Sequence, residues 1–180
     1  THKDVVYGFV GRISQFKNLD YLLTEFKLYF EKYPLDKLFI YGEGPELQSM
    51  NSFIKQNNLL NNINILGFEP DKEKIYSTID VLIDPSYGQG ISNANLEAMS
   101  TKTLVIASKV DGNIDLIEDG KTGLLFELRK KDALLNKLIY YKSSPNEAKL
   151  MIDNARKMIL EKYDIKSIPP KIINFILCRN

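Results

Sequence analysis

Residues 84–100, which read DPSYGQGISNANLEAMS, combine residue types that could bind an anionic, hydroxyl-bearing ligand. The two glycines would let the backbone approach a ligand closely, because glycine carries no side chain. Ser92 or Asn93 could cap a helix that carries Glu97 one turn in, and the free N–H groups of such a first turn are a ready anion site. The carboxylate of Glu97 could accept hydrogen bonds from hydroxyl groups, or it could only stabilise the helix dipole, by roughly 0.3–1 kcal/mol.

Two cations near the start of the chain could serve the same anion. Arg12 closely follows the apolar run 5–10, and Lys17 lies just before the first amphipathic segment. The forked guanidinium of arginine and the point charge of lysine together suit a diphosphate. Either cation alone could equally be an ordinary solvated loop residue, so the hypothesis depends on whether the fold brings both to one edge with Glu97.

The elements that must position these residues follow from the pattern of apolar residues. Short apolar runs predict strands at residues 5–10, 37–42, 63–66, 81–85, 103–108 and 123–127. Helical spacing and capping residues predict helices at residues 19–33, 45–58, 71–79, 93–99, 131–141 and 146–163. The segment SKVDGNID, residues 108–115, is expected to be a glycine-containing turn.

Alternating strands and helices predict the α/β fold class. Because the strands are continuous apolar runs, residues 1–180 are expected to form a single Rossmann-like domain with a sheet of about six, mostly parallel strands and helices on both faces. In such sheets, ligands bind outside the carboxyl ends of the strands. The candidate cations, the glycine turn and Glu97 would then share one edge.

Composition argues against several classes of function. The net charge is +1, so nothing indicates nucleic acid or an anionic membrane as a bulk electrostatic partner. His2 is the only histidine and Cys178 the only cysteine, which argues against a His/Cys metal cluster, a Ser-His-Asp triad and any internal disulfide. No apolar run approaches the roughly 20 residues of a membrane span. The chain starts at Thr1 without methionine, which leaves open that an upstream part is missing.

Three short motifs fail on inspection. GKT, at residues 120–122, lacks the preceding glycine of a phosphate-binding loop, and DGNIDL, at residues 111–116, lacks the glycine and glutamate of a calcium loop. GEGPEL, at residues 42–47, lacks the third glycine of a dinucleotide fingerprint, which favours a plain strand-to-helix turn and makes a nicotinamide-dependent oxidoreductase a remote alternative. The chain also has no Asp-x-Asp pair to clamp a metal diphosphate.

Several sequence blocks, in order, resemble one known family. GRISQFKNLDYLLTEF resembles its Gly-Arg to Lys-Gly loop and helix, LFIYGEGPEL its strand and GxGP turn, and INILGFEPDKEKIYSTIDVLIDPS its Gly-aromatic loop, short helix and strand. EAMS, VIAS and EDGKTGLLFE resemble its closing segments. From Val5 to about Tyr163, the chain is similar to the C-terminal half of retaining glycosyltransferases of group 1, family 4, which have the GT-B fold.

The resemblance implies a role for each candidate residue. The family signature is two glutamates with seven residues between them; Glu97 matches the second, and Gln89 stands in place of the first. Glu97 would bind the ribose and Gln89 the transferred sugar, while Arg12 and Lys17 would hold the diphosphate and stabilise the leaving group; these four form the implied catalytic set. The other implied donor-binding residues are Gly11, Gly67, Phe68, Gly90, Ile91, Ser92 and Asn93.

The chain departs from the family pattern at four positions. Gln89 can form hydrogen bonds but lacks the charge that a carboxylate offers to a cationic transition state. Lys102 and Leu104 replace a usual glycine and proline, and Asp111 replaces the first of two glycines. A lysine in a left-handed helix cap would cost about 1 kcal/mol, so the turn at Lys102 could differ from that of the family.

By resemblance, the chain is expected to be the nucleotide-sugar-binding, C-terminal domain of a glycosyltransferase of the hexosyltransferase type. The implied reaction transfers a sugar, with retention, from a UDP- or GDP-sugar to an acceptor glycan or lipid-linked glycan in polysaccharide or glycolipid biosynthesis. No metal, other cofactor or nucleic acid is expected. The alternative is a catalytically inactive nucleotide-sugar-binding module, which Gln89 motivates.

The family also places its acceptor site on an N-terminal domain that is absent from these 180 residues. That missing domain is the expected partner of this one, and the isolated chain is expected to bind donor weakly and to transfer nothing. The implied location is the cytoplasm, with any peripheral attachment to the inner face of the membrane left to the missing domain.

Overall fold

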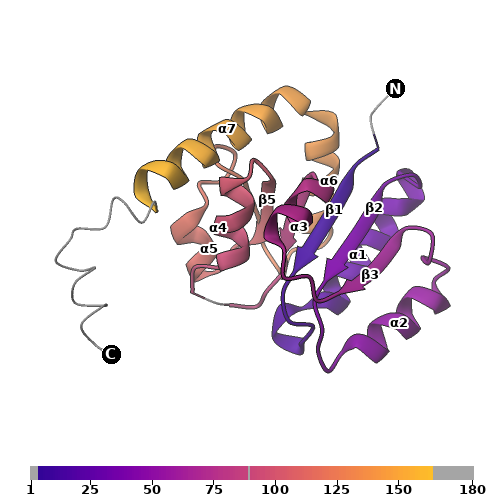
Figure 1. The fold of residues 1–180 in the computed structure, drawn as a ribbon. Coiled ribbons are helices and arrows are strands. Elements are labelled where there is room, and N and C mark those ends of the chain that lie inside the picture. The colour runs from indigo at the N-terminus through magenta and orange to yellow at the C-terminus, as the bar shows by residue number, and fades with distance from the viewer. Residues whose placement is uncertain (1–3, 89, 164–180) are drawn as a thin grey trace, which may run out of the picture.

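The computed structural model describes residues 4–88 and 90–163, which form a six-stranded parallel sheet covered by helices (Figure 1). The strands are β1 (Val6–Val10), β2 (Lys37–Tyr41), β3 (Ile63–Gly67), β4 (Val81–Asp84), β5 (Leu104–Ser108) and β6 (Leu124–Phe126). The helices are η1 (Gln15–Lys17, a 3₁₀ turn), α1 (Leu19–Lys32), α2 (Leu47–Gln56), α3 (Lys72–Thr78), α4 (Asn93–Ser100), α5 (Asp111–Leu116), α6 (Ala133–Ser143) and α7 (Pro145–Lys162). The predicted α/β class and the predicted strands are confirmed.

The order of the strands creates a crevice at the centre of the sheet. The order is β3-β2-β1-β4-β5-β6, and every neighbouring pair is parallel. The chain thus builds outward from β1 to β3, returns to the centre, and builds outward again from β4 to β6. At such a reversal the loops at the carboxyl ends of the two central strands diverge and leave room for a ligand. Here those loops follow β1 and β4, and they carry Arg12, Lys17 and the segment before Glu97.

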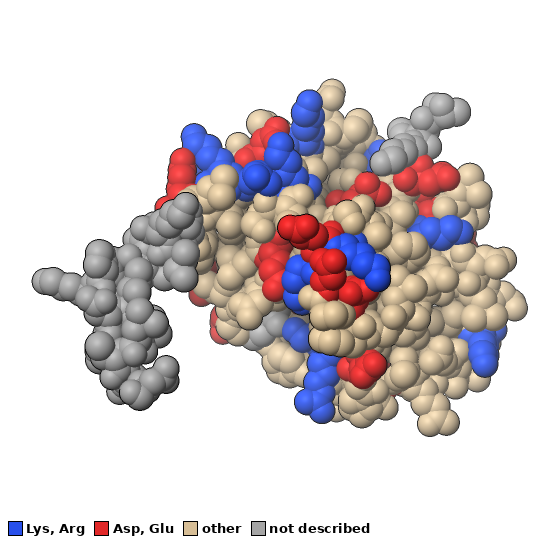
Figure 2. Space-filling view, viewed as in Figure 1, with Lys and Arg blue, Asp and Glu red and all other residues tan. Residues whose placement is uncertain are grey.

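Both faces of the sheet are apolar because the strand side chains alternate between two buried clusters. In β4, Ile83 belongs to the cluster under α1, α2 and α6, whereas Leu82 belongs to the cluster under α3, α4 and part of α7. The two sets of helices lie on opposite faces of the sheet. Figure 2 shows acidic and basic side chains intermingled over α3.

A buried ion pair lies at the amino edge of the sheet, away from the crevice. Lys142 Nζ of α6 lies 2.6 Å from Asp36 Oδ1, and the Lys142 side chain is only 6% exposed. The Tyr29 hydroxyl donates to Asp36 Oδ2 over 2.7 Å, and the Val5 amide donates to Oδ1 over 3.0 Å. Burial raises the pKa of Tyr29, so its hydroxyl stays protonated and acts as a donor. The network ties α1 and α6 to the starts of β1 and β2.

Two local features differ from or extend the sequence expectations. Residues 111–116, expected to be a turn, form α5, because Asn113 is buried and its side-chain amide donates to the Ser108 carbonyl over 3.0 Å. Lys102 has φ 65°, so it adopts the left-handed cap that the sequence identified as costly.

Within the part of the chain that the structure describes, no helix is both long and apolar enough to cross a membrane.

Candidate functional site

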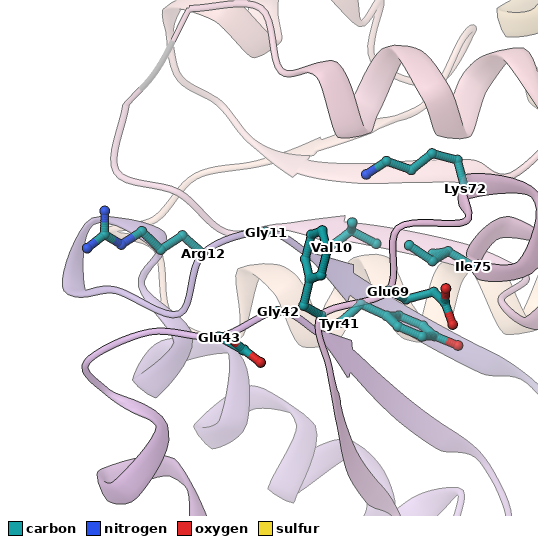
Figure 3. A pocket seen from close by; sticks show the side chains of 10 residues that line it. Val10, Gly11, Arg12, Tyr41, Gly42, Glu43, Glu69, Lys72 and Ile75 are labelled. Atoms are coloured by element: carbon teal, nitrogen blue, oxygen red, sulfur yellow. The ribbon is translucent and has the colours of Figure 1, made fainter.

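A cavity of about 310 Å³ opens at the carboxyl ends of β1, β2 and β3 (Figure 3). Its lining residues are Val10, Gly11, Arg12, Tyr41, Gly42, Glu43, Phe68, Glu69, Lys72 and Ile75. In Figure 3 the Lys72 side chain extends along one side of the cavity, whereas the Arg12 side chain points away from Tyr41 and Glu69. Apolar and aromatic side chains therefore form much of the interior, with cations toward its border.

Backbone hydrogen bonds hold the three surrounding loops together. The amide of Gly11 donates to the carbonyl of Tyr41 over 3.0 Å, and the amide of Gly42 donates to the carbonyl of Gly67 over 2.8 Å. These bonds extend the strand ladders past the ends of β1 and β2. The sheet itself thus fixes the position of the loops that border the cavity.

The two glycines of GEGPEL allow the loop after β2 to lie directly against the loop after β1. A Cβ atom at Gly42 would lie 1.8 Å from the carbonyl oxygen of Gly11, and one at Gly44 would lie 2.0 Å from the carbonyl oxygen of Ile13. Only glycine lets the loop after β2 lie against the loop after β1. The plain strand-to-helix turn favoured from the sequence is present, and it supports the loop that carries Arg12.

The two predicted cations lie at this carboxyl edge. Arg12 is exposed and lines the cavity, while Lys17 ends η1 and is partly buried. The stem of Lys17 passes beside Gly11, since a Cβ atom at Gly11 would lie 3.9 Å from Lys17 Cε. The structure therefore places both cations as the sequence expects, and their role toward a ligand stays a prediction.

Glu97 reaches the same edge from α4, and α3 holds its carboxylate. The side chain of Glu97 is 33% exposed, and its Oε2 lies 3.6 Å from Lys72 Nζ. The hydroxyl oxygen of Tyr76 lies 2.8 Å from the same Oε2 and 3.1 Å from the carbonyl oxygen of Ala94. Because Lys72 also lines the cavity, it connects the Glu97 carboxylate to the cavity border.

Tyr76 is suited to orient Glu97. Its side chain is buried, and burial, followed by the hydrogen bond to Glu97, raises the pKa of the hydroxyl above its ordinary value. The phenol therefore stays protonated and can donate. Neither Tyr76 nor Lys72 was predicted as a site residue. One signal could have found them: residues 71–79 directly follow the Gly67–Phe68 loop, so this helix had to begin at the same edge.

The first turn of α4 is not capped by the side chain of its N-cap residue. Ser92 is the N-cap residue, with φ −77° and ψ 125°, and its side chain makes no capping hydrogen bond. The first-turn amides are therefore not covered by that side chain. A Cβ atom at Gly90 would meet no atom within 4 Å, and Ile91 and Asn93 are exposed. Room is thus present for a ligand beside the predicted amide site.

A buried polar cluster fixes α4 to the sheet. Asn95 is fully buried, and its Nδ2 donates to Asp84 Oδ2 over 3.0 Å and to Asn113 Oδ1 over 2.9 Å. Oδ1 of Asn95 has no hydrogen-bond partner in the described part of the chain. The cluster joins the end of β4 to α4 and α5, which fixes the start of α4 at the crevice. The sequence did not predict it, because an asparagine in a helical segment gives no sign of which residue it will meet.

The predicted site residues fall into two groups at the carboxyl edge. Gly11, Arg12 and Phe68 line the cavity, and Gly67 lies immediately before Phe68 at its border. The residues predicted from the β4–α4 segment lie on the other side of the crevice, where Glu97 is linked to the cavity through Lys72. Gln89, which was predicted to bind the transferred sugar, lies outside the described residues. Within residues 4–88 and 90–163, no group of three or more His, Cys, Asp or Glu is arranged to hold a metal.

Comparison with known proteins identifies the family. Residues 1–158 match the sequence model described as "Glycosyl transferases group 1". The chain belongs to this family. It is 28% identical over 170 residues to the poly(ribitol-phosphate) alpha-N-acetylglucosaminyltransferase of Staphylococcus aureus, covering 94% of this chain and 34% of the relative. The chain thus spans about a third of the length of that protein, and the resemblance to group-1 glycosyltransferases is confirmed.

Solved structures of this family have the same fold. A mutant of S. aureus TarM, in a complex that includes UDP, superposes with a TM-score of 0.86 at 27% identity, covering 95% of this chain and 35% of that one. The C-terminal domain of a glycosyl transferase group 1 family protein (LpcC) from Francisella tularensis superposes with a TM-score of 0.80 at 26% identity, covering 89% of this chain and 87% of that one. The fold is therefore that of one Rossmann-like domain of GT-B glycosyltransferases.

Proposed function

We propose that this chain is the donor-binding half of a retaining glycosyltransferase, which transfers a sugar from a nucleotide diphosphate sugar to an acceptor in polysaccharide or glycolipid biosynthesis. One observation carries the proposal beyond family membership. Arg12 and Lys17 follow β1, and the start of α4 and Glu97 follow β4, so all four lie at the carboxyl edge on the two sides of the central crevice. Two cations and free amides suit a diphosphate, and a neighbouring carboxylate suits the hydroxyls of a ribose.

Each part of the donor has a place in this arrangement. The base would enter the cavity beside Phe68, whose side chain is 71% exposed, and the ribose would bind Glu97. Arg12, Lys17 and the amides of Ser92 and Asn93 would hold the diphosphate. Gly11, Gly90 and Ile91 would bring the backbone close to it, and Gln89 would meet the transferred sugar.

The chemical contribution of this half is electrostatic. As the sugar departs, negative charge develops on the diphosphate, and fixed cations and amides stabilise it most strongly in a site that excludes water. The two cations would supply the charge that a metal supplies elsewhere, so we propose that the reaction uses no metal or other cofactor. The UDP in the complex of the related S. aureus TarM mutant supports a uridine nucleotide as donor, with a guanosine nucleotide as the other candidate.

The acceptor would be a glycan or a lipid-linked glycan, held by an N-terminal domain that these residues do not include. The name of the S. aureus relative supports a glycan-forming role, since that protein is called a poly(ribitol-phosphate) alpha-N-acetylglucosaminyltransferase. We place the reaction in the cytoplasm, with any contact to the inner face of the membrane made through the other domain.

A second candidate is a nucleotide-sugar-binding module without catalytic activity, which Gln89 favours because it removes a carboxylate from the sugar position. Restoring the charge by Gln89→Glu in the full-length protein separates the two candidates. A rise in donor hydrolysis from zero would support a module that has lost its activity. Unchanged activity would support an enzyme that works with glutamine.

The proposal is tested with the full-length protein and a panel of UDP- and GDP-sugars, with sugar transfer and donor hydrolysis as readouts. We expect turnover of at least one donor, loss of about tenfold or more in kcat/KM for Arg12→Ala, and a product that keeps the anomeric configuration of the donor. Turnover that is unchanged in Arg12→Ala would contradict the proposed role of this edge, and an inverted product would contradict retention.

A further inference from the structure

A second cavity, of about 510 Å³, opens at the same carboxyl edge but at the ends of β5 and β6. The residues that matter for its chemistry are Asn18, Tyr21, Tyr87, Lys109, Glu127 and Arg129. Tyr87 belongs to the loop after β4, two positions before Gln89. The second cavity and the cavity beside Phe68 therefore lie on opposite sides of the central crevice.

The walls of the second cavity are fixed by the sheet and by α1. The amide of Lys109 donates to the carbonyl of Phe126 over 2.7 Å, so the chain segments after β5 and β6 leave the sheet side by side. The ring of Tyr21 stacks on Phe126, with centroids 5.9 Å apart and planes inclined by 20°. The Tyr21 hydroxyl accepts a hydrogen bond from the amide of Leu134 over 3.3 Å. The backbone after β5 and β6 and the ring of Tyr21 are thus held in place at the cavity wall.

The charges on these walls are available to a ligand. Lys109 and Arg129 are exposed, and within residues 4–88 and 90–163 neither forms an ion pair. Among the described lining residues, Glu127 is the only acid. Tyr87 adds an aromatic ring that is 57% exposed. A forked guanidinium and an ammonium suit a phosphate, a carboxylate suits hydroxyl groups, and an exposed ring offers an apolar face.

We propose that the second cavity binds a sugar phosphate or polyol phosphate. Lys109 and Arg129 would hold the phosphate, Glu127 would accept hydrogen bonds from the hydroxyls, and Tyr87 would pack against the carbon skeleton. Because the base of the donor is assigned to the other side of the crevice and its diphosphate to Arg12, Lys17 and the start of α4, this ligand would be a phosphorylated segment of the acceptor, additional to the part that the N-terminal domain holds. That last assignment rests on the proposed function, whereas the binding itself does not.

The test uses sn-glycerol 3-phosphate, inorganic phosphate and glycerol as probes, titrated into the chain while amide resonances are followed by NMR. We expect glycerol 3-phosphate to shift the amides of Tyr87, Lys109 and Arg129, inorganic phosphate to bind more weakly, and glycerol to have no effect at the same concentration. Lys109→Ala and Arg129→Ala should each weaken binding of glycerol 3-phosphate about tenfold, in line with loss of a charge-assisted hydrogen bond. Lys131→Ala removes a neighbouring charge outside the cavity lining and should leave binding unchanged.

Each other outcome overturns the proposal. Absence of shifts with glycerol 3-phosphate would exclude the site, and equal loss in Lys131→Ala would indicate only a diffuse basic surface. Equal binding of inorganic phosphate would indicate an anion site with no preference for a polyol. Shifts confined to Arg12, Lys17 and the start of α4 would place the phosphate at the donor site. A parallel titration with UDP distinguishes the two proposals, because the proposed function fails if UDP does not bind, whatever glycerol 3-phosphate does.

Discussion

The hydroxyl of Tyr76 lies 2.8 Å from Oε2 of Glu97 and joins α3 to α4 at the edge of the crevice. Tyr76 is buried, and Lys72 lies 3.6 Å from the same oxygen. Two residues of α3 therefore hold the one acid that α4 places at the site. The position of Glu97 depends on a neighbouring helix as well as on its own.

Tyr76→Phe removes this hydrogen bond and keeps the ring. We expect UDP to bind about fivefold to tenfold more weakly, because a freely rotating Glu97 must be ordered when the ribose binds. Titration calorimetry checks the result, and Tyr140→Phe, at an exposed tyrosine of α6, is the matched control. Equal affinities for Tyr76→Phe and the unmodified chain would show that the hydrogen bond does not prepare the site.

Gly44→Ala should disrupt the contact between the loops after β1 and β2. Its Cβ atom would lie 2.0 Å from a backbone oxygen of Ile13, which cannot move away as a flexible side chain could. We expect the free energy of unfolding to fall by roughly 2–3 kcal/mol or more, as for other overpacked sites. Gly88→Ala is the control, since a Cβ atom there meets nothing within 4 Å. Similar denaturation midpoints for the two variants would contradict the packing role.

Lys102→Gly should stabilise the protein. Lys102 has φ 65°, and relief of this left-handed conformation is worth up to about 1 kcal/mol. The pair that the substitution removes, Lys102 Nζ to Asp153 Oδ1 at 3.8 Å, is exposed and contributes little. Lys121→Gly is the control. Lys121 is an exposed turn residue that is not among the residues with positive φ, so this substitution should not stabilise the protein. A lower unfolding midpoint for Lys102→Gly would show that the lysine makes a stabilising contribution larger than the cost of its left-handed conformation.

Lys142→Met should cost about 3–5 kcal/mol of unfolding free energy, because it leaves the buried carboxylate of Asp36 without its cation. Lys137→Met breaks a more exposed pair with Asp119 and should cost no more than about 1 kcal/mol. Urea unfolding of both variants measures the difference. Equal costs would mean that the buried pair adds nothing specific to the link between α6 and the start of β2.

The sequence predicted what depends on local pattern. The apolar runs of β1 to β6 and the amphipathic helices are visible in the chain, and parallel strands oblige their carboxyl ends to share an edge. Arg12, Lys17 and Glu97 could therefore be assigned to one region before the structure was known. The glycine pair 42 and 44 was also assigned correctly to a turn.

Contacts between distant segments could not be predicted in this way. Tyr76 meets Glu97 21 positions away, and Asp36 meets Lys142 106 positions away. No local pattern of residues records such pairings. α5 was missed for a related reason: it is stabilised by Asn113, whose partners in β5 and α4 become visible only when the sheet is assembled.

The central claim is that the carboxyl edge binds a nucleoside diphosphate, and titration of UDP into this chain by calorimetry tests it most directly. We predict measurable binding that weakens about tenfold in each of Arg12→Ala and Glu97→Ala, as expected for loss of a charge-assisted contact, and that is unchanged in Lys27→Ala, an exposed lysine on the outer surface of α1. Absence of binding at millimolar UDP and GDP, or equal affinities in all three variants, would contradict the account.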